Sequence, residues 1–167
     1  QDSSSQLLGK TLPPFDLTDQ NQNPVNLDSL RGKVWVTNLM FATCPGICLQ
    51  LGKHMQKIDA HFSKPNDLRI VSLSINPEND TPAVLKEYAQ KLNASPRWLF
   101  LTGSRDQIVK LANQGLFLSA GTPEVLTHSE KFVLIDRKGA LRGFFDGENP
   151  KNIPTIIAAI EKLLQEP

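Results

Sequence analysis

Hydrophobic and polar positions along the chain follow two periods, which predict strands and helices in alternation. A nearly unbroken apolar run from Val34 to Phe41 is typical of a central strand that is covered on both faces. After this run, apolar residues recur at spacings of three and four, the period of a helix with one buried face. Those positions are Ile47, Leu51, Met55, Ile58 and Phe62. A strand followed by an amphipathic helix is therefore the predicted centre of the fold.

The rest of the chain continues the alternation. Two short segments, 12–17 and 24–27, flank an Asp/Asn-rich turn and predict an N-terminal β-hairpin, with a further turn over 28–33. Strands are expected over 68–75, 98–101, 131–135 and 141–145, and helices over 83–92, 105–114 and from 153 onward. Segment 63–66 is expected to end the first long helix, and 115–127 to be irregular or a hairpin. Thr81 and Asn152 are expected to cap helices. This order predicts an α/β fold with a mixed central β-sheet flanked by helices.

Composition limits the possible partners of the chain. The 167 residues carry a net charge of +1, which gives no basis for binding nucleic acid or an anionic membrane surface. Apolar runs are far shorter than the roughly 18 residues that a membrane span requires. Residues 1–10 are expected to form a flexible tether and residues 11–167 a single domain. Because the chain begins with Gln1 and not with Met, we expect that an upstream segment has been removed.

Cys44 and Cys48 are the only cysteines, and they follow the predicted central strand at the expected start of a helix. Four residues are slightly more than one helical turn, so both sulfurs are expected on one side, close enough to form a disulfide. The same spacing allows two thiolates to bind one soft metal ion. The positive end of the helix dipole is expected to favour thiolate over thiol. The alternative is a pair of buried structural cysteines.

Four ordered sequence blocks resemble the Sco (SenC/PrrC) family of the thioredoxin-like superfamily. Its F-T-x-C-P-D-x-C-P block is matched by residues 41–49 and its S-x-D-P-E-x-D-T-P block by residues 74–82. An L-T-G before a helix is matched by residues 101–103. The D-H-S block before a strand is matched by residues 127–129, which lead to an Asp136–Gly139 turn. The resemblance covers the chain from about residue 15 onward.

The resemblance implies a thioredoxin-like fold and a copper site made of Cys44, Cys48 and His128, for Cu(I), Cu(II) or both. It implies a monomeric metallochaperone that delivers copper to the dinuclear copper centre of cytochrome c oxidase. Its partners would be the copper-bearing subunit of the oxidase and another copper chaperone. The expected location is the bacterial periplasm, anchored to the inner membrane through the removed segment, with the mitochondrial intermembrane space as the alternative.

The same residues are compatible with a second function. Cys44 and Cys48 are also the redox pair expected of a thiol–disulfide oxidoreductase, which would keep the copper-site cysteines of its target reduced. His128 discriminates between the two functions, because disulfide exchange needs no imidazole ligand. Soft sulfur and imidazole donors favour copper.

This sequence departs from the family pattern at several polar positions. Gly46 and Asn76 stand where the family usually has Asp, Leu49 replaces a Pro, and Thr127 replaces the Asp before the histidine. With fewer carboxylates near the site, we expect Cu(II) to be disfavoured relative to Cu(I).

Other ionisable residues of the sequence are expected to lie outside the site. His54 and His61 are predicted to lie on a solvated helix face, because His54 is six residues from Cys48. Glu78 and Asp80 precede a helix and are interpreted as structural loop acids and not as acid–base catalysts.

Overall fold

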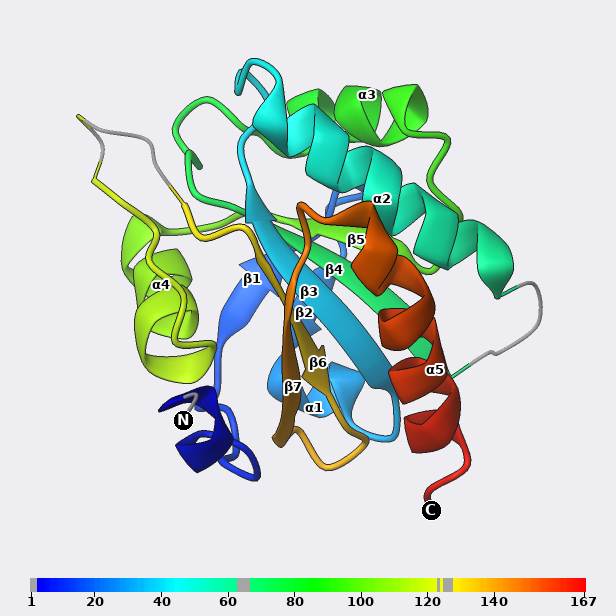
Figure 1. The fold of residues 1–167 in the computed structure, drawn as a ribbon. Coiled ribbons are helices and arrows are strands. Elements are labelled where there is room, and N and C mark those ends of the chain that lie inside the picture. The colour runs from blue at the N-terminus through cyan, green and yellow to red at the C-terminus, as the bar shows by residue number, and fades with distance from the viewer. Residues whose placement is uncertain (1–2, 63–66, 123, 125–127) are drawn as a thin grey trace.

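A five-stranded mixed sheet forms the centre of the computed structural model, which describes residues 3–62, 67–122, 124 and 128–167 (Figure 1). The strands are β3 (Val34–Met40), β4 (Leu68–Ser74), β5 (Trp98–Leu101), β6 (Lys131–Ile135) and β7 (Leu141–Asp146). Their order is β5-β4-β3-β6-β7. β4 is parallel to both β3 and β5, whereas β6 is antiparallel to β3 and to β7. The predicted mixed α/β architecture is confirmed.

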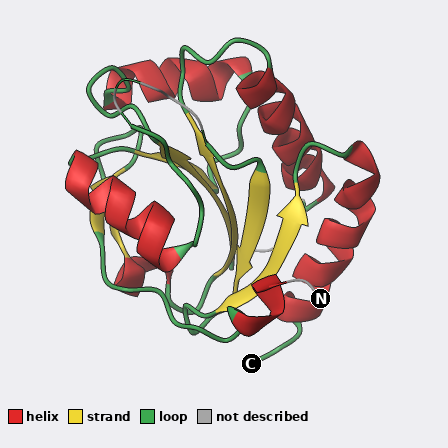
Figure 2. Cartoon of the chain, turned by 60° about the vertical axis from the view of Figure 1, so that its left-hand side comes forward, coloured by secondary structure: helices red, strands yellow, loops and turns green. Residues whose placement is uncertain are grey.

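Helices lie on both sides of this sheet (Figure 2). They are α1 (Leu27–Leu30), α2 (Ile47–His61), α3 (Pro82–Lys91), α4 (Arg105–Lys110) and α5 (Ile153–Leu164). α2 and α5 cross the sheet on the same side, and α4 lies away from them (Figure 1). No helix within the described residues is long and apolar enough to span a bilayer.

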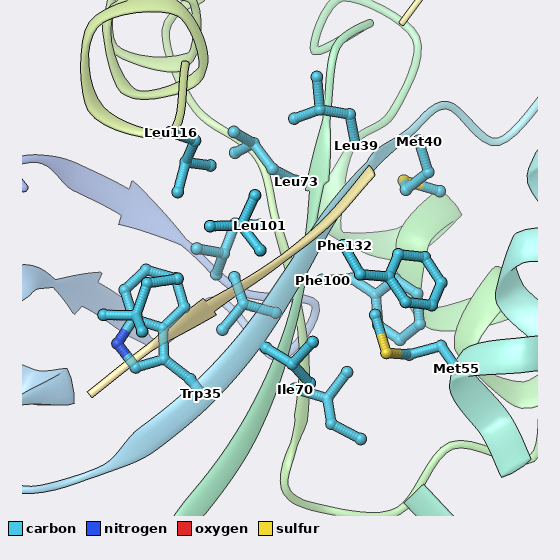
Figure 3. Close-up of a cluster of buried hydrophobic side chains, with 14 of the residues drawn as sticks. Trp35, Leu39, Met40, Met55, Ile70, Leu73, Phe100, Leu101, Leu116 and Phe132 are labelled. Atoms are coloured by element: carbon cyan, nitrogen blue, oxygen red, sulfur yellow. The ribbon is translucent and has the colours of Figure 1, made fainter. Parts of the chain in front are cut away.

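β3 is the most enclosed strand, because all seven of its residues are buried. A strand that has helices over both faces has no side that can carry exposed polar residues, which explains why the run is nearly all apolar. The predicted stripe of α2 packs onto it, with Leu51, Met55 and Ile58 each 0% exposed. Figure 3 shows this core, in which side chains from β3, β4, β5, β6 and α2 gather in one cluster.

The predicted N-terminal hairpin is present as β1 (Asp16–Thr18) paired antiparallel with β2 (Pro24–Asn26). Residues 9 and 10, in the segment that is expected to be a flexible tether, make hydrogen bonds to the sheet. A short 3-10 helix, η1 (Ser3–Gln6), is followed by backbone hydrogen bonds from Gly9 N to Leu141 O (2.7 Å) and from Leu141 N to Lys10 O (2.9 Å). These bonds attach residues 9 and 10 to the start of β7.

Two predicted elements begin or end differently from the sequence expectation. The turn expected over 28–33 begins as α1, because the side chains of Asn26 and Ser29 cap its first turn reciprocally. The helix expected over 105–114 is α-helical only as far as Lys110. It then continues as a π-helical turn, η2 (Leu111–Gly115).

Asn152 occupies the expected N-cap position of α5 but does not cap it with its side chain. Asn152 ends a 3-10 turn, η3 (Pro150–Asn152), and its side chain makes no capping hydrogen bond to α5. The side chain of Asn149 instead accepts from Lys151 N at 3.0 Å. Two expectations lie outside the described residues: the helix-ending segment 63–66 and most of the irregular stretch 123–127.

Candidate metal centre

The three sequence-predicted ligands lie at the C-terminal end of β3, at the start of α2 and just before β6. Cys48 is the second residue of α2, but Cys44 lies in the loop before the helix. Of the pair expected at the start of a helix, only Cys48 lies within it, so the helical spacing assumed for the two sulfurs does not apply to Cys44. Pro45 disfavours helical dihedrals in the residue before it, and Gly46 has a positive φ of 87°. α2 therefore begins only at Ile47.

The loop nevertheless brings the predicted ligands together. One ligand atom each from Cys44, Cys48 and His128 lies within 4.8 Å of the other two. The Sγ atom of Cys48 is 2.8 Å from the Nε2 atom of His128. Cys48 is buried, whereas Cys44 and His128 are half-buried, so the centre opens to solvent on the side of these two residues.

A hydrogen bond on the far side of the ring sets the tautomer of His128. Its Nδ1 atom lies 2.9 Å from the carbonyl oxygen of Ser129. Because a carbonyl oxygen can only accept, Nδ1 carries the proton, and Nε2 presents its lone pair to Cys48. The ring also packs edge-on against Phe41, with centroids 5.9 Å apart. Burial lowers the pKa of His128, although its bond to Ser129 opposes the shift. The imidazole is thus held neutral, as a metal ligand must be.

Cys48 departs from the expectation that a helix start favours thiolate. Burial raises the pKa of the Cys48 thiol well above its usual range, and a hydrogen bond with the Cys44 side chain raises it further. A backbone hydrogen bond with Phe41 has the opposite but smaller effect. Desolvation therefore outweighs the helix dipole, and Cys48 remains a thiol until a cation replaces its proton.

The buried carboxylate of Asp80 anchors the loop that leads from β3 to Cys44. Its carboxylate is 0% exposed and accepts from Ala42 N at 2.9 Å and from Ser74 Oγ at 2.7 Å. A third bond comes from Asn79 Nδ2 at 2.8 Å. Ala42 lies two residues before Cys44, so this buried acid fixes the chain where it leaves β3. The structural interpretation of Asp80 is consistent with these contacts, but its link to the cysteine loop was not visible in the sequence.

The remaining candidate residues lie apart from the three ligands. Glu78 forms an ion pair with Arg105. His61 is exposed, with its Nε2 atom 3.6 Å from Glu161. His54 was wrongly predicted to be solvated: it is buried, and its Nδ1 atom lies 2.7 Å from the carbonyl oxygen of Gly147. The cause is the packing of the end of β7 over α2, which helical periodicity alone does not reveal.

The donor atoms of the three predicted ligands determine which metals the site can bind. Two sulfurs and one imidazole are soft to intermediate donors, which suit copper better than magnesium or calcium. A second cluster in the described part of the chain, made of Glu130, Asp146 and Glu148, offers only carboxylates at the surface. That cluster lacks the soft donors that copper favours. The backbone bond that orients His128 is also typical of metal-ligating histidines.

Comparison with known proteins identifies the family. The SCO1/SenC family model matches residues 4–165. A SCO1 protein homolog of Bacillus subtilis (strain 168) is 31% identical over 160 residues, which cover 92% of this chain and 83% of the relative.

Two solved structures extend this likeness to the fold. BsSco, a member of the Sco family of cytochrome c oxidase assembly proteins, is 30% identical, with a TM-score of 0.86 over 96% of each chain. ScoI of Bradyrhizobium japonicum with copper bound is 25% identical, with a TM-score of 0.78 over 92% of this chain and 99% of that one. The predicted thioredoxin-like fold is thereby confirmed. The chain belongs to the SCO1/SenC family.

Proposed function

We propose that this protein binds one copper ion through Cys44, Cys48 and His128 and delivers it during cytochrome c oxidase assembly, to the dinuclear copper centre. The observation that carries the proposal is the convergence of two sulfurs and one imidazole nitrogen within 4.8 Å of one another. Two described relatives support it, one with copper bound and one from a family of cytochrome c oxidase assembly proteins.

Each ligand has a distinct part in this function. Cys48 is buried and anchored in α2, so it supplies a fixed sulfur. Cys44 is half-buried and outside the helix, so it is the more accessible sulfur for an incoming donor or recipient. His128 adds a neutral nitrogen that is already oriented by Ser129. Copper is the cargo, and both thiol protons leave when it binds.

A second function uses the same two sulfurs without the histidine. The close approach of Cys44 and Cys48 supports reversible disulfide formation, in which two thiols lose two electrons and two protons to an oxidant. The relative BsSco is described with a disulfide switch. In this alternative the protein reduces the copper-site cysteines of its target and becomes oxidised itself.

The recipient that we propose is the copper-bearing subunit of the oxidase, with another copper chaperone as a donor. The expected compartment is extracytoplasmic, the bacterial periplasm or the mitochondrial intermembrane space. Transfer of copper from the loaded protein to a copper-free soluble domain of that subunit would test the recipient directly. Copper that stays on the donor after mixing would contradict it.

An anaerobic copper titration of the fully reduced protein tests the central proposal. We expect one copper per chain by native mass spectrometry and, for Cu(II), sulfur-to-metal charge-transfer absorbance that saturates at one equivalent. The free-thiol count should be measured before the titration, so that oxidised protein is not mistaken for protein that cannot bind. A fully reduced chain that leaves copper with a weak buffer ligand would overturn the proposal.

A further inference from the structure

Phe41 lies directly after β3 and connects to each of the three proposed copper ligands. Its carbonyl oxygen accepts a hydrogen bond from Cys44 N at 3.1 Å. Its backbone is also hydrogen-bonded to Cys48, and its ring packs edge-on against the ring of His128, with 86° between the two planes. Phe41 is 8% exposed. One buried residue thus contacts two ligands through its main chain and the third through its side chain.

The main chain of Phe41 is held on both sides. Before it, Met40 O accepts a hydrogen bond from Ile75 N at 2.9 Å, which continues the pairing of β3 with β4. After it, Ala42 N donates to the buried carboxylate of Asp80 at 2.9 Å. The ring of Phe41 therefore projects from a part of the backbone that is fixed in place.

His128 depends on side-chain contacts for its position, because it precedes β6 and belongs to no helix or strand. Its bond to Ser129 O joins neighbours in the chain, so it orients the imidazole only relative to its own backbone. The imidazole is tied to other segments by the Sγ atom of Cys48, at 2.8 Å, and by the ring of Phe41. Copper must lie between the sulfur and the nitrogen, so loading replaces the first of these contacts but not the second.

We propose that Phe41 is a positioning residue of the copper centre, whose ring holds the imidazole of His128 in the orientation that copper requires. This inference rests on the proposed copper function. A ligand that is already oriented loses less conformational freedom when the metal binds, so the gain appears as affinity. Cu(II) should depend on this effect more than Cu(I), because two soft thiolates already suit Cu(I) well.

Phe41→Leu removes the ring but keeps an apolar side chain and the same backbone. We expect Cu(II) to bind about 2- to 12-fold more weakly, which corresponds to the contribution of one edge-on aromatic pair. The affinity for Cu(I) should change less. A mild oxidant should still remove two titratable thiols, because the hydrogen bonds to the cysteines come from the backbone of Phe41 and not from its ring. Anaerobic competition with a chelator of known affinity measures both copper states.

Phe62→Leu provides a matched control. Phe62 is 6% exposed, and its ring also packs edge-on against a histidine, His61, with centroids 4.9 Å apart. His61 lies outside the three-residue cluster. Both substitutions remove a buried ring and one pair of this kind, so both should lower the free energy of unfolding in urea. Only Phe41→Leu should weaken Cu(II).

The same substitution in a His128→Ala background tests whether the ring acts through the imidazole. Phe41→Leu should then weaken Cu(II) in the parent but not in the protein that already lacks His128. A loss of the same size in both backgrounds would overturn the inference, because the ring would then act through the cysteine loop or through the fold as a whole.

A further readout needs no metal. Isotope-labelled histidine gives NMR signals from the three histidines of the chain, and the His128→Ala and His61→Ala variants assign two of them. In the reduced, metal-free protein we expect Phe41→Leu to move the His128 signal, because the imidazole loses the ring current of its neighbour. Phe62→Leu should move the His61 signal instead. A His128 signal that Phe41→Leu leaves in place would overturn the inference.

The outcomes separate this inference from the function on which it rests. A parent that binds no copper would overturn the proposed function. A parent that binds copper, together with Phe41→Leu of unchanged Cu(II) affinity, would overturn the role of Phe41 alone. Equal losses of Cu(II) affinity in Phe41→Leu and Phe62→Leu would also overturn it, since a general loss of packing would then account for both.

Discussion

The Nε2 atom of His128 lies 2.8 Å from the Sγ atom of Cys48, although 80 positions separate the two residues in the chain. Cys48 is anchored in α2, and His128 stands just before β6, which pairs directly with β3. The sheet order therefore brings the two distant residues into contact. It places a neutral nitrogen beside a buried sulfur before any metal arrives.

His128→Ala should separate the two proposed functions in one variant. We expect weaker copper binding, particularly for Cu(II), because one of three ligands is lost. The disulfide between Cys44 and Cys48 should still form, since it requires only the sulfurs. Copper titration and a thiol count after mild oxidation measure both properties.

His61→Ala is the matched control for that variant, because His61 is exposed and lies outside the three-residue cluster. It should bind copper as the parent does. If His128→Ala also retains both copper states unchanged, His128 is not a ligand and the reductase function becomes the stronger one.

Copper affinity should rise with pH. Burial and the Cys44 side chain hold the pKa of Cys48 above its usual range, so its proton competes with copper throughout neutral pH. Burial lowers the pKa of His128, so the imidazole competes less than an exposed histidine would. Because thiol protons leave when copper binds, the apparent affinity should gain at least about tenfold per pH unit. Competition with a chelator of known pH dependence, from pH 6 to pH 8, measures how the copper affinity changes with pH. A copper affinity that does not change over this range would contradict a protonated, buried Cys48.

Two leucines of α2, one exposed and one buried, test which face of this helix packs into the core. Leu51 is 0% exposed, whereas Leu49 is 39% exposed. Leu51→Ala should lower the free energy of unfolding by about 2–5 kcal/mol, because it leaves a cavity. Leu49→Ala should change it by less than about 0.5 kcal/mol. Urea unfolding of the metal-free, reduced proteins measures both values, and similar losses would refute the assigned helix face.

Asp80→Ala should destabilise the cysteine loop. It leaves the half-buried Ala42 N–H and the buried Ser74 hydroxyl without their acceptor. The expected loss is about 2–4 kcal/mol, since each unsatisfied buried group costs about 1–3 kcal/mol. Ser74→Ala removes one donor only and should cost clearly less. Chemical unfolding compares the two, and an Asp80→Ala protein as stable as the parent would disprove the anchoring role.

Gly46 can be tested for its effect on the copper oxidation state, provided that backbone strain is controlled. Its φ of 87° lies where side chains are rarely tolerated, so Gly46→Asp and Gly46→Ala should both lose stability. Only the aspartate adds negative charge near the centre, so it alone should strengthen Cu(II) relative to Cu(I). The ratio of the two affinities in Gly46→Asp against Gly46→Ala isolates the charge, and equal ratios would show that the missing acid is neutral.

The central strand and the cysteine pair could be recognised in the sequence because both have strong local signals. Seven buried residues in β3 leave a nearly continuous apolar run, and Cys44 and Cys48 are the only cysteines. His128 was found through a resemblance and not through periodicity. The sequence alone gives no distance between His128 and the cysteines.

The features that were predicted incorrectly depend on tertiary contacts or on backbone geometry. His54 is buried because the chain at Gly147 folds over α2. This contact cannot be inferred from the spacing of residues in α2. Cys44 falls outside the helix because Pro45 and Gly46 delay its start. The thiol state of Cys48 follows from burial, which outweighs the favourable helix dipole only once the loop is packed.

The central place of β3 also determines when the full donor set can exist. β4 can pair in parallel with β3, and β5 with β4, while β6 is still absent. During synthesis from the N-terminus, Cys44 and Cys48 therefore emerge well before the strand that brings His128 to them. A partly folded chain at that stage has one edge of β3 unpaired and two thiols without their imidazole. Selective copper loading should thus follow the pairing of β6 with β3, and earlier intermediates would instead be exposed to oxidation of the cysteine pair.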